Sequence, residues 1–495
     1  MDISTSHKTK VFWFFTLALV FGLTLPILIQ EGMFQDAVLY SCVAHNLSEG
    51  FGTFWFPQYS TLNLEGIPSF HEQPPLIFGI LALFHKVLGS SLYVERLYVF
   101  LTIIGHIYLI QYFWKEIVNY SGAANEKLKS LNWVPVFFWI LIPICFWSFR
   151  GNMLENSMSL FTMGAIIVAY KNLKQNRNLA WWTLAGLLIF LASFSKGLPG
   201  LFPIGMPFIH WIIFRKKSFP KIALYTIILL AIPTIIYFVF YLFPESRESL
   251  RIYVVERLLR RVSSMPTTDS RWETPWRLFQ ELIPILSITL LTYLITKKKK
   301  RKANFGVLKK EATFFLIIGL SAILPLILTM VQKGWYMVPG FPFLAIGLAL
   351  FIAPSLYEWI NKINVNSKVF KAVKYFSIFS LLFVLVLTFF MKGKISRHED
   401  MVKDVYEIGT VVPRFSTLTI PKEMYYQYDF ILQGFLVRNF NISISPEKKY
   451  RYFLTEKDKD YEVPPGYSLI KSELSTYYLY ENVDYEAKEA TKQPK

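Results

Sequence analysis

Cysteine is scarce in this chain, and the two thiols present, Cys42 and Cys145, are too few to form a disulfide framework. We interpret them as unlinked thiols. The sequence also lacks a Walker-type phosphate loop and a glycine-rich dinucleotide fingerprint, which argues against an ATP-driven machine. No internal repeat is visible, although many transporter folds are built from repeats.

Acidic residues are the second shortage, because 34 Asp and Glu face 52 Lys and Arg for a net charge of +18. Residues 392–495 hold 16 of each sign, so the whole excess lies in 1–391, where 36 basic residues face 18 acidic ones. A multipass membrane protein concentrates Lys and Arg in its cytoplasmic loops. That distribution explains the positive charge without a nucleic-acid partner.

Apolar residues are abundant, at 53% of the chain, with a mean hydropathy of +0.37. Several apolar runs approach the ~20 residues that cross a hydrocarbon core. The composition therefore predicts an all-α polytopic membrane protein. The first run is too long for a removed signal peptide. We expect eleven spans, at about 11–29, 96–114, 131–148, 154–170, 179–195, 198–214, 222–243, 277–296, 312–330, 335–353 and 373–391.

The loop charges predict the orientation. With the N-terminus inside, the inner segments carry 24 basic and 5 acidic residues, whereas the outer segments up to 391 carry 12 and 13. This bias predicts a bacterial inner-membrane protein with a cytoplasmic N-terminus and a periplasmic C-terminal segment. It requires that the short apolar stretch 74–89 lie at the interface and not cross.

The outer segments divide into loops and one further domain. Residues 30–95 should form a large loop with two short helices, the first from Asp36 as N-cap to about Ser48. We expect Val38, Leu39, Cys42 and Leu47 of that helix to lie on the membrane surface. Residues 392–495, with the alternating runs YRYFL, YSLI and TYYLYE, predict a small α/β domain with a disordered tail, so that 1–391 is the transmembrane domain.

Ionisable residues gather at the predicted outer boundary of the membrane. Charges so close to hydrocarbon are costly unless they are paired or line a wet cavity, so they are candidates for function. Purely structural roles stay open for some of these residues. Asp36 could only cap a helix, and Glu95 with Arg96 could anchor a helix end. Arg247 and Arg251 could contact lipid headgroups. The candidates are Asp36, His71, Glu72, Arg150, Glu155, Lys196, Arg257, Arg260, Arg261, Arg271, Lys333 and Tyr336.

The order of these residues resembles the GT-C superfamily of glycosyltransferases that use polyprenyl-phosphate sugars. It is most similar to the 4-amino-4-deoxy-L-arabinose (lipid A) transferases and the protein O-mannosyltransferases. Asp36-Ala-Val-Leu-Tyr40 is similar to the family's D-E-A-x-Y, with Ala37 in place of the second acid. Glu72-Gln73-Pro74-Pro75-Leu76 is similar to K-P-P-L, with Gln73 where lysine is common. The family's R-L-P-S is similar to Arg96-Leu97-Tyr98, and its R…(D/E) element is similar to Arg150 with Glu155. Its T-K-G-P is similar to Ser195-Lys196-Gly197-Leu198-Pro199. Its R-Y-x-x-P-x-x-P is similar to Trp335-Tyr336-Met337-Val338-Pro339 with Pro342.

The resemblance implies sugar transfer with inversion from a polyprenyl-phosphate donor to an acceptor hydroxyl or phosphate on a glycolipid or a protein. Asp36 and Glu155 would be the catalytic residues, with Asp36 as the base. His71, Glu72 and Arg150 would bind substrate. A divalent metal at His71 and Glu72 stays open, although two ligands are a poor set. The donor phosphate would meet Lys196, Arg257, Arg260, Arg271, Lys333 and Tyr336.

Two other functions share the same features. A glycan ligase would use similar chemistry on a whole glycan chain. A transporter of polyprenyl-linked glycans should show repeats and broken or charged helices at the bilayer midplane. The candidates here stand at the boundary instead.

Overall fold

The computed structural model describes residues 3–64, 67–175, 178–260, 266–298, 308–427, 430–482 and 485. Contacts divide the chain into two compact units. The first unit comprises residues 1–27, 100–150 and 154–390, and the second comprises 28–99, 151–153 and 391–495. Arg261, most of the basic segment 297–310 and the predicted disordered tail lie outside the described residues.

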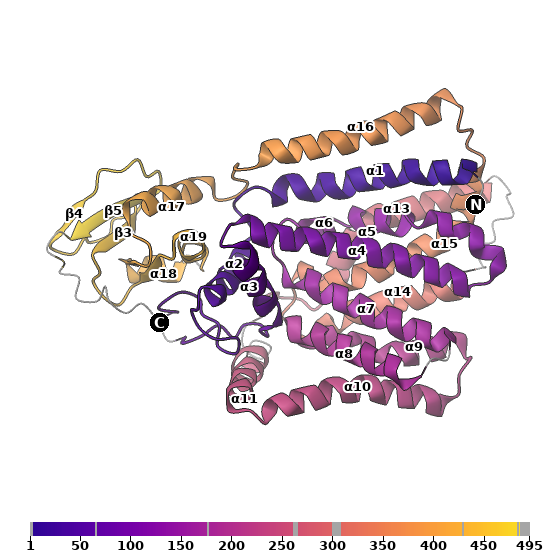
Figure 1. Cartoon of the computed structure of the whole chain (residues 1–495), viewed down its shortest axis with the longest axis horizontal. Coiled ribbons are helices and arrows are strands. Elements are labelled where there is room, and N and C mark those ends of the chain that lie inside the picture. The colour runs from indigo at the N-terminus through magenta and orange to yellow at the C-terminus, as the bar shows by residue number, and fades with distance from the viewer. Residues whose placement is uncertain are drawn as a thin grey trace. The chain divides into compact units, whose positions relative to one another are not determined.

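The first unit is a bundle of apolar helices (Figure 1). Eight helical segments among the described residues are long and apolar enough to cross a membrane, which confirms a polytopic α-helical protein. These segments are Ser6–Leu28, Tyr93–Tyr120, Leu179–Lys196, Phe219–Tyr241, Glu273–Lys297, Lys309–Leu328, Gly334–Asn361 and Lys368–Met391. The helices of this part of the chain are α1 (Ile3–Leu28), α4 (Tyr93–Tyr120), η1 (Ala123–Leu131), α5 (Val134–Leu141), α6 (Pro143–Ser148), α7 (Leu154–Gln175), α8 (Leu179–Lys196), η2 (Leu198–Gly205), α9 (Met206–Phe214), α10 (Phe219–Tyr241), α11 (Pro244–Arg251), η3 (Ile252–Leu259), α13 (Glu273–Lys298), α14 (Lys309–Ile323), η4 (Leu324–Leu328), η5 (Gly334–Gly340), α15 (Phe341–Asn361) and α16 (Lys368–Met391).

The three other predicted spans are helical too, but two of them are interrupted. The run 131–148 breaks into α5 and α6 at Ile142, which has an extended backbone before Pro143. A residue before proline is disfavoured in the helical region, and proline cannot donate the next backbone hydrogen bond. The run 198–214 begins as the 3₁₀ segment η2 and continues as α9, while 154–170 lies within the single helix α7. Eleven spans and an inner N-terminus therefore stay predictions.

Glycines let the helices of the first unit approach closely. A Cβ on Gly319 of α14 would lie 2.6 Å from the Leu344 side chain of α15 and 2.9 Å from the Gly340 carbonyl oxygen. Small residues at such contacts are the usual means by which membrane helices pack. The contact holds η5, which carries Tyr336, against α14.

The second unit joins the first predicted loop to the C-terminal segment, a grouping that the sequence did not indicate. The loop carries two helices as expected, α2 (Gln35–Ser48) and α3 (Leu76–Leu88). The C-terminal segment holds α17 (Glu399–Val411), α18 (Lys422–Gln427) and α19 (Ile431–Phe440). Its sheet has the order β2-β1-β3-β5-β4, from β1 (Thr417–Thr419), β2 (Ser443–Ser445), β3 (Tyr452–Glu456), β4 (Tyr467–Leu469) and β5 (Tyr477–Asn482).

The sheet is mixed. Strand β1 pairs in parallel with β2 and β3, and β5 pairs antiparallel with β3 and β4. The predicted α/β character of the C-terminal segment and its three strand runs are confirmed, whereas a separate domain at 392–495 stays a prediction. Strands β1 and β2, with the sequences TLT and SIS, were missed because each holds a single apolar residue and so shows no repeated alternation.

Two predictions for α2 are wrong. The helix begins at Gln35, its N-cap is Phe34, and Asp36 lies inside the first turn, so Asp36 is not the cap. Val38 and Cys42 do not lie on the membrane surface, because their side chains are 2% and 0% exposed within the second unit. Gly434 of α19 covers Val38, and the Cys42 thiol faces the Tyr59 carbonyl oxygen at 3.5 Å.

We predict that Gly319→Ala lowers the thermal stability of the purified protein, because overpacking of a tight contact costs ~1–3 kcal/mol. Gly164→Ala is the matched control, since its Cβ would meet only Leu188, at an ordinary 3.4 Å. That variant should melt at or slightly above the wild-type temperature, because alanine favours helix. Equal melting temperatures for the two variants would contradict the close packing of α14 on η5.

Candidate functional site

The centre of the candidate site in the first unit is a buried ion pair. Glu155 is the second residue of α7 and Lys196 is the last residue of α8, so the two packed helices bring both side chains to one end of the bundle. The Lys196 Nζ lies 3.0 Å from the Glu155 Oε1, and the two side chains are 5% and 0% exposed. An ammonium and a carboxylate this deeply buried are tolerated because each compensates the other.

The turn after Lys196 requires glycine. Gly197 has a φ of +82°, and a Cβ there would lie 1.9 Å from the Tyr253 hydroxyl oxygen. A Cβ on Gly200 would lie 2.4 Å from the backbone of Ala192 and Ser193 at the end of α8. These two glycines therefore allow the chain to fold back tightly beside Lys196.

Tyr253 is a member of the site that the sequence did not reveal. It belongs to η3, a π-helix, a conformation often found at functional sites. Burial raises the pKa of the Tyr253 phenol, Tyr237 raises it further, and the positive charge of Lys196 lowers it. The only hint in the sequence is a tyrosine within an arginine-rich loop.

Tyr336 and Lys333 belong to the same neighbourhood. The Lys196 Nζ lies 5.7 Å from the centroid of the Tyr336 ring. Trp335 stacks on Trp147 at 5.6 Å, and the Lys333 Nζ lies 5.8 Å from the Trp335 ring. The structure thus brings Lys196, Glu155 and Tyr336 together. Lys333 lies by the ring of Trp335, the residue before Tyr336.

Arg271 joins this group through backbone contacts. The Gln332 side-chain oxygen accepts hydrogen bonds from the Thr274 amide at 2.9 Å and the Thr274 hydroxyl at 2.6 Å. The Gln332 side-chain amide donates to the Arg271 carbonyl at 3.4 Å. The loop that holds Arg271 is therefore bound to the residue before Lys333.

Arg277 is a further cation that the sequence analysis did not single out. A Cβ on Gly334 would lie 3.5 Å from the Arg277 Nε. Arg277 pairs with Glu281 at 2.8 Å, and the buried Glu281 also accepts the Ile144 amide at 2.7 Å. The sequence signal for this ion pair is that Arg277 precedes Glu281 by four residues on the predicted helix.

Three further predicted cations are Arg150, Arg257 and Arg260. The Arg150 Nε donates to the Leu23 carbonyl at 3.1 Å, and its guanidinium lies over Phe146, while the partner of Glu155 is Lys196. Arg257 is half-buried in η3, and Arg260 is the exposed C-cap of that helix.

In the second unit, Asp36 is half-buried in the first turn of α2. The next residue, Ala37, is fully buried, and a Cβ on Gly151 would lie 2.8 Å from its methyl group. A second carboxylate at 37 would be buried against backbone. The packing accounts for alanine where the resembling family has an acid.

His71 and Glu72 are both held by neighbours. The His71 Nδ1 lies 3.1 Å from the Ser69 hydroxyl, and its ring meets the Phe56 ring edge-on. The Tyr59 hydroxyl donates to Glu72 at 3.4 Å. Within the described ranges, no group of three or more His, Cys, Asp or Glu is placed to hold a metal.

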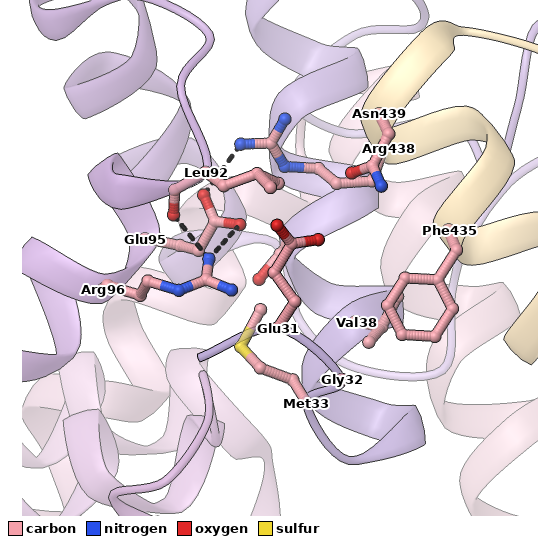
Figure 2. A pocket seen from close by; sticks show the side chains of 11 residues that line it. Glu31, Gly32, Met33, Val38, Leu92, Glu95, Arg96, Phe435, Arg438 and Asn439 are labelled. Atoms are coloured by element: carbon pink, nitrogen blue, oxygen red, sulfur yellow. Dashed lines mark hydrogen bonds and ion pairs between the residues drawn. The ribbon is translucent and has the colours of Figure 1, made fainter. Parts of the chain in front are cut away.

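Arg438 of α19 binds the start of α4 in the same unit (Figure 2). Its guanidinium donates to Glu95 at 2.8 Å and to the carbonyls of Ser90 and Ser91 at 3.0 and 3.1 Å. Arg96 donates to the Leu92 carbonyl at 2.6 Å and the Gln30 carbonyl at 2.9 Å. These contacts support the reading of Glu95 and Arg96 as a structural anchor.

The fold of the whole chain is similar to solved structures of membrane glycosyltransferases. ArnT from Cupriavidus metallidurans, solved bound to undecaprenyl phosphate, matches with a TM-score of 0.63 and 12% identity over 97% of each chain. The apo form of ArnT gives the same TM-score and identity over 93% of this chain and 96% of that one. The chain has a GT-C fold.

A third solved structure is more distant. The apo oligosaccharyltransferase from Archaeoglobus fulgidus matches with a TM-score of 0.50 and 12% identity, covering 88% of this chain and 64% of that one. No family model and no curated protein matches the chain.

We predict that Lys196→Met destabilises the protein strongly, because removing one partner of a buried ion pair costs ~3–5 kcal/mol. The double variant Glu155→Gln/Lys196→Met should recover much of that loss. Thermal unfolding of the single and double variants measures the coupling. As a control, Lys403→Met breaks an exposed pair with Glu399 at 2.7 Å and should leave the melting temperature unchanged. If the loss of stability in the double variant equals the sum of the losses in Glu155→Gln and Lys196→Met, the two residues are not coupled.

Proposed function

We propose that this protein is a membrane glycosyltransferase that moves a sugar from a polyprenyl-phosphate donor to an acceptor, with inversion. The observation that carries the proposal is the gathering of Lys196, Tyr336, Lys333 and Arg271 at one end of the bundle in a GT-C fold. That ArnT was solved with undecaprenyl phosphate supports the lipid-phosphate donor. The acceptor would be lipid A, another glycolipid or a protein.

The first chemical task is to remove a proton from the acceptor. Asp36 takes the hydroxyl proton while the acceptor oxygen bonds to the anomeric carbon of the sugar. A base positioned for this transfer contributes ~10²–10⁴-fold in rate. Asp36 suits the role because it is a half-buried carboxylate in the first turn of α2.

The second task is to accommodate the leaving group. As the bond between the anomeric carbon and the phosphate oxygen breaks, negative charge grows on the polyprenyl phosphate. Fixed cations lower the barrier because their attraction increases with this charge. We assign this role to Lys196, Lys333 and Arg271, with Tyr336 beside Lys196. Arg257 and Arg260, which precede Arg271 in the chain, belong to the same group.

Glu155 has a different role in this proposal. It was a catalytic candidate, but its side chain is fully buried and paired with Lys196. We therefore assign it to positioning the Lys196 ammonium and not to proton transfer. His71, Glu72 and Arg150 remain candidates for contacts with the substrate.

The cellular setting belongs to the same proposal. The loop charges favour a bacterial inner membrane with a cytoplasmic N-terminus and the 392–495 segment in the periplasm. Transfer would then occur at the outer face, where a polyprenyl-linked sugar enters sideways from the bilayer. Membrane lipids are the surroundings of the site, and no nucleic acid takes part.

The test is donor turnover by the purified protein, supplied with lipid extract from its own membrane. We expect Asp36→Asn to release polyprenyl phosphate ~10²–10⁴-fold more slowly than wild type. The matched control is Asp400→Asn, an exposed aspartate in the first turn of α17, which should keep full activity. Unchanged turnover in folded Asp36→Asn would remove Asp36 from the chemistry.

The same assay separates the alternatives. Transfer of whole glycan chains but not of single sugars would identify a ligase. Movement of lipid-linked glycans across vesicles without any release of polyprenyl phosphate would identify a transporter and overturn the proposal.

A further inference from the structure

A cavity of about 480 Å³ lies at the end of the first unit where α16 begins. Its lining includes His7 of α1, Asn366 of the turn before α16, and Phe370, Lys371, Lys374 and Tyr375 of α16. His7 faces Phe370 with their ring centroids 5.8 Å apart, which joins α1 to α16 at this end. The site discussed above uses none of these residues.

The ionisable residues that line this cavity, among those the structure describes, are a histidine and lysines. The two segments that build it, 6–10 and 361–375, contain no Asp or Glu. The buried Lys8 donates from its Nζ to the Asn361 carbonyl at 2.9 Å, which fixes α1 to the end of α15. A ligand in this cavity would meet the side chains of Lys371 and Lys374. The lysines of the two segments are Lys8, Lys10, Lys362, Lys368, Lys371 and Lys374.

An apolar stripe continues from the cavity along α16. Lys371, Tyr375, Phe379 and Phe383 follow one another at intervals of four residues, so they lie on one face of the helix. The three aromatic side chains are 65%, 66% and 53% exposed, and the Phe379 and Phe383 rings stack at 6.2 Å. A cationic cavity above an apolar stripe matches a molecule with an anionic head and a hydrocarbon tail.

The cavity is distinct from the donor-phosphate cluster. Arg150, five residues before Glu155, bonds to the carbonyl of Leu23 near one end of α1, whereas the cavity uses His7 near the other end. Sixteen residues of helix separate His7 from Leu23, which is ~24 Å at 1.5 Å per residue. The two sites therefore lie near opposite ends of the membrane helices.

We propose that this cavity binds an anionic phospholipid. Its phosphate interacts with Lys371 and Lys374, its headgroup fills the space beside His7, and an acyl chain follows Tyr375, Phe379 and Phe383. Basic pockets between membrane helices are known to hold acidic headgroups in this way. The inference stands independently of the sugar-transfer proposal.

The test measures the thermal stability of the full, delipidated chain in detergent with added phosphatidylglycerol, phosphatidylcholine or inorganic phosphate. A ligand that binds only the folded state raises the melting temperature. We expect a rise of several degrees with phosphatidylglycerol and none with the other two. Lys371→Gln/Lys374→Gln should abolish the rise while melting normally without lipid.

The matched control is Lys362→Gln/Lys368→Gln, which removes two exposed lysines outside the cavity lining and should keep the full rise. Phe379→Ser is a second probe, expected to reduce the rise even if the double lysine variant fails to fold. A rise unchanged in Lys371→Gln/Lys374→Gln and Phe379→Ser overturns the proposal. An equal rise with phosphatidylcholine also overturns the proposal. An equal rise with inorganic phosphate overturns it too, because it would identify a site for free anions.

Discussion

The buried ion pair between Glu155 and Lys196 is the interaction on which the candidate site depends. Two charges buried at the ends of packed membrane helices are costly, and their mutual attraction offsets part of that cost. The pair fixes the end of α7 against the end of α8. Gly197 then allows Tyr253 to approach, and η5 adds Tyr336 beside the ammonium. The surrounding loops carry Lys333, Arg271 and Arg277, so positive charge extends outward from a fixed anchor.

The second unit shows a comparable constraint on α2, the helix that carries Asp36. Ala37 packs on Gly151, and Val38 packs under Gly434 of α19. Arg438 of α19 also binds Glu95 and two carbonyls that precede α4. Burial lowers the pKa of His45, also on α2, to about 3, so this histidine is neutral at physiological pH. The C-terminal segment therefore braces the first loop by direct contact, which gives this otherwise unassigned segment a structural role.

Much of this architecture follows from the sequence, and the failures have physical causes. Apolar runs predict the helices because hydrocarbon leaves few alternatives to them, and the Lys196–Pro199 motif predicts one charge of the central pair. Val38 and Cys42 were assigned to the membrane surface because an apolar helix face looks the same whether lipid or protein covers it. Tyr253, Arg277 and Arg438 were not recognised because their roles come from contacts between distant segments. The capping role given to Asp36 was wrong because the N-cap, Phe34, lies two residues earlier, a difference that a local sequence pattern rarely resolves.

The most direct test of the proposed donor site is a cryo-EM structure of the full chain with a bound polyprenyl phosphate. The account predicts the phosphate at hydrogen-bonding distance, ~2.7–2.9 Å, from at least one of Lys196, Lys333 and Arg271. It also predicts that the Glu155 carboxylate stays on Lys196. A phosphate bound elsewhere in the molecule, with Lys196, Lys333 and Arg271 all out of reach, would contradict the proposed donor site.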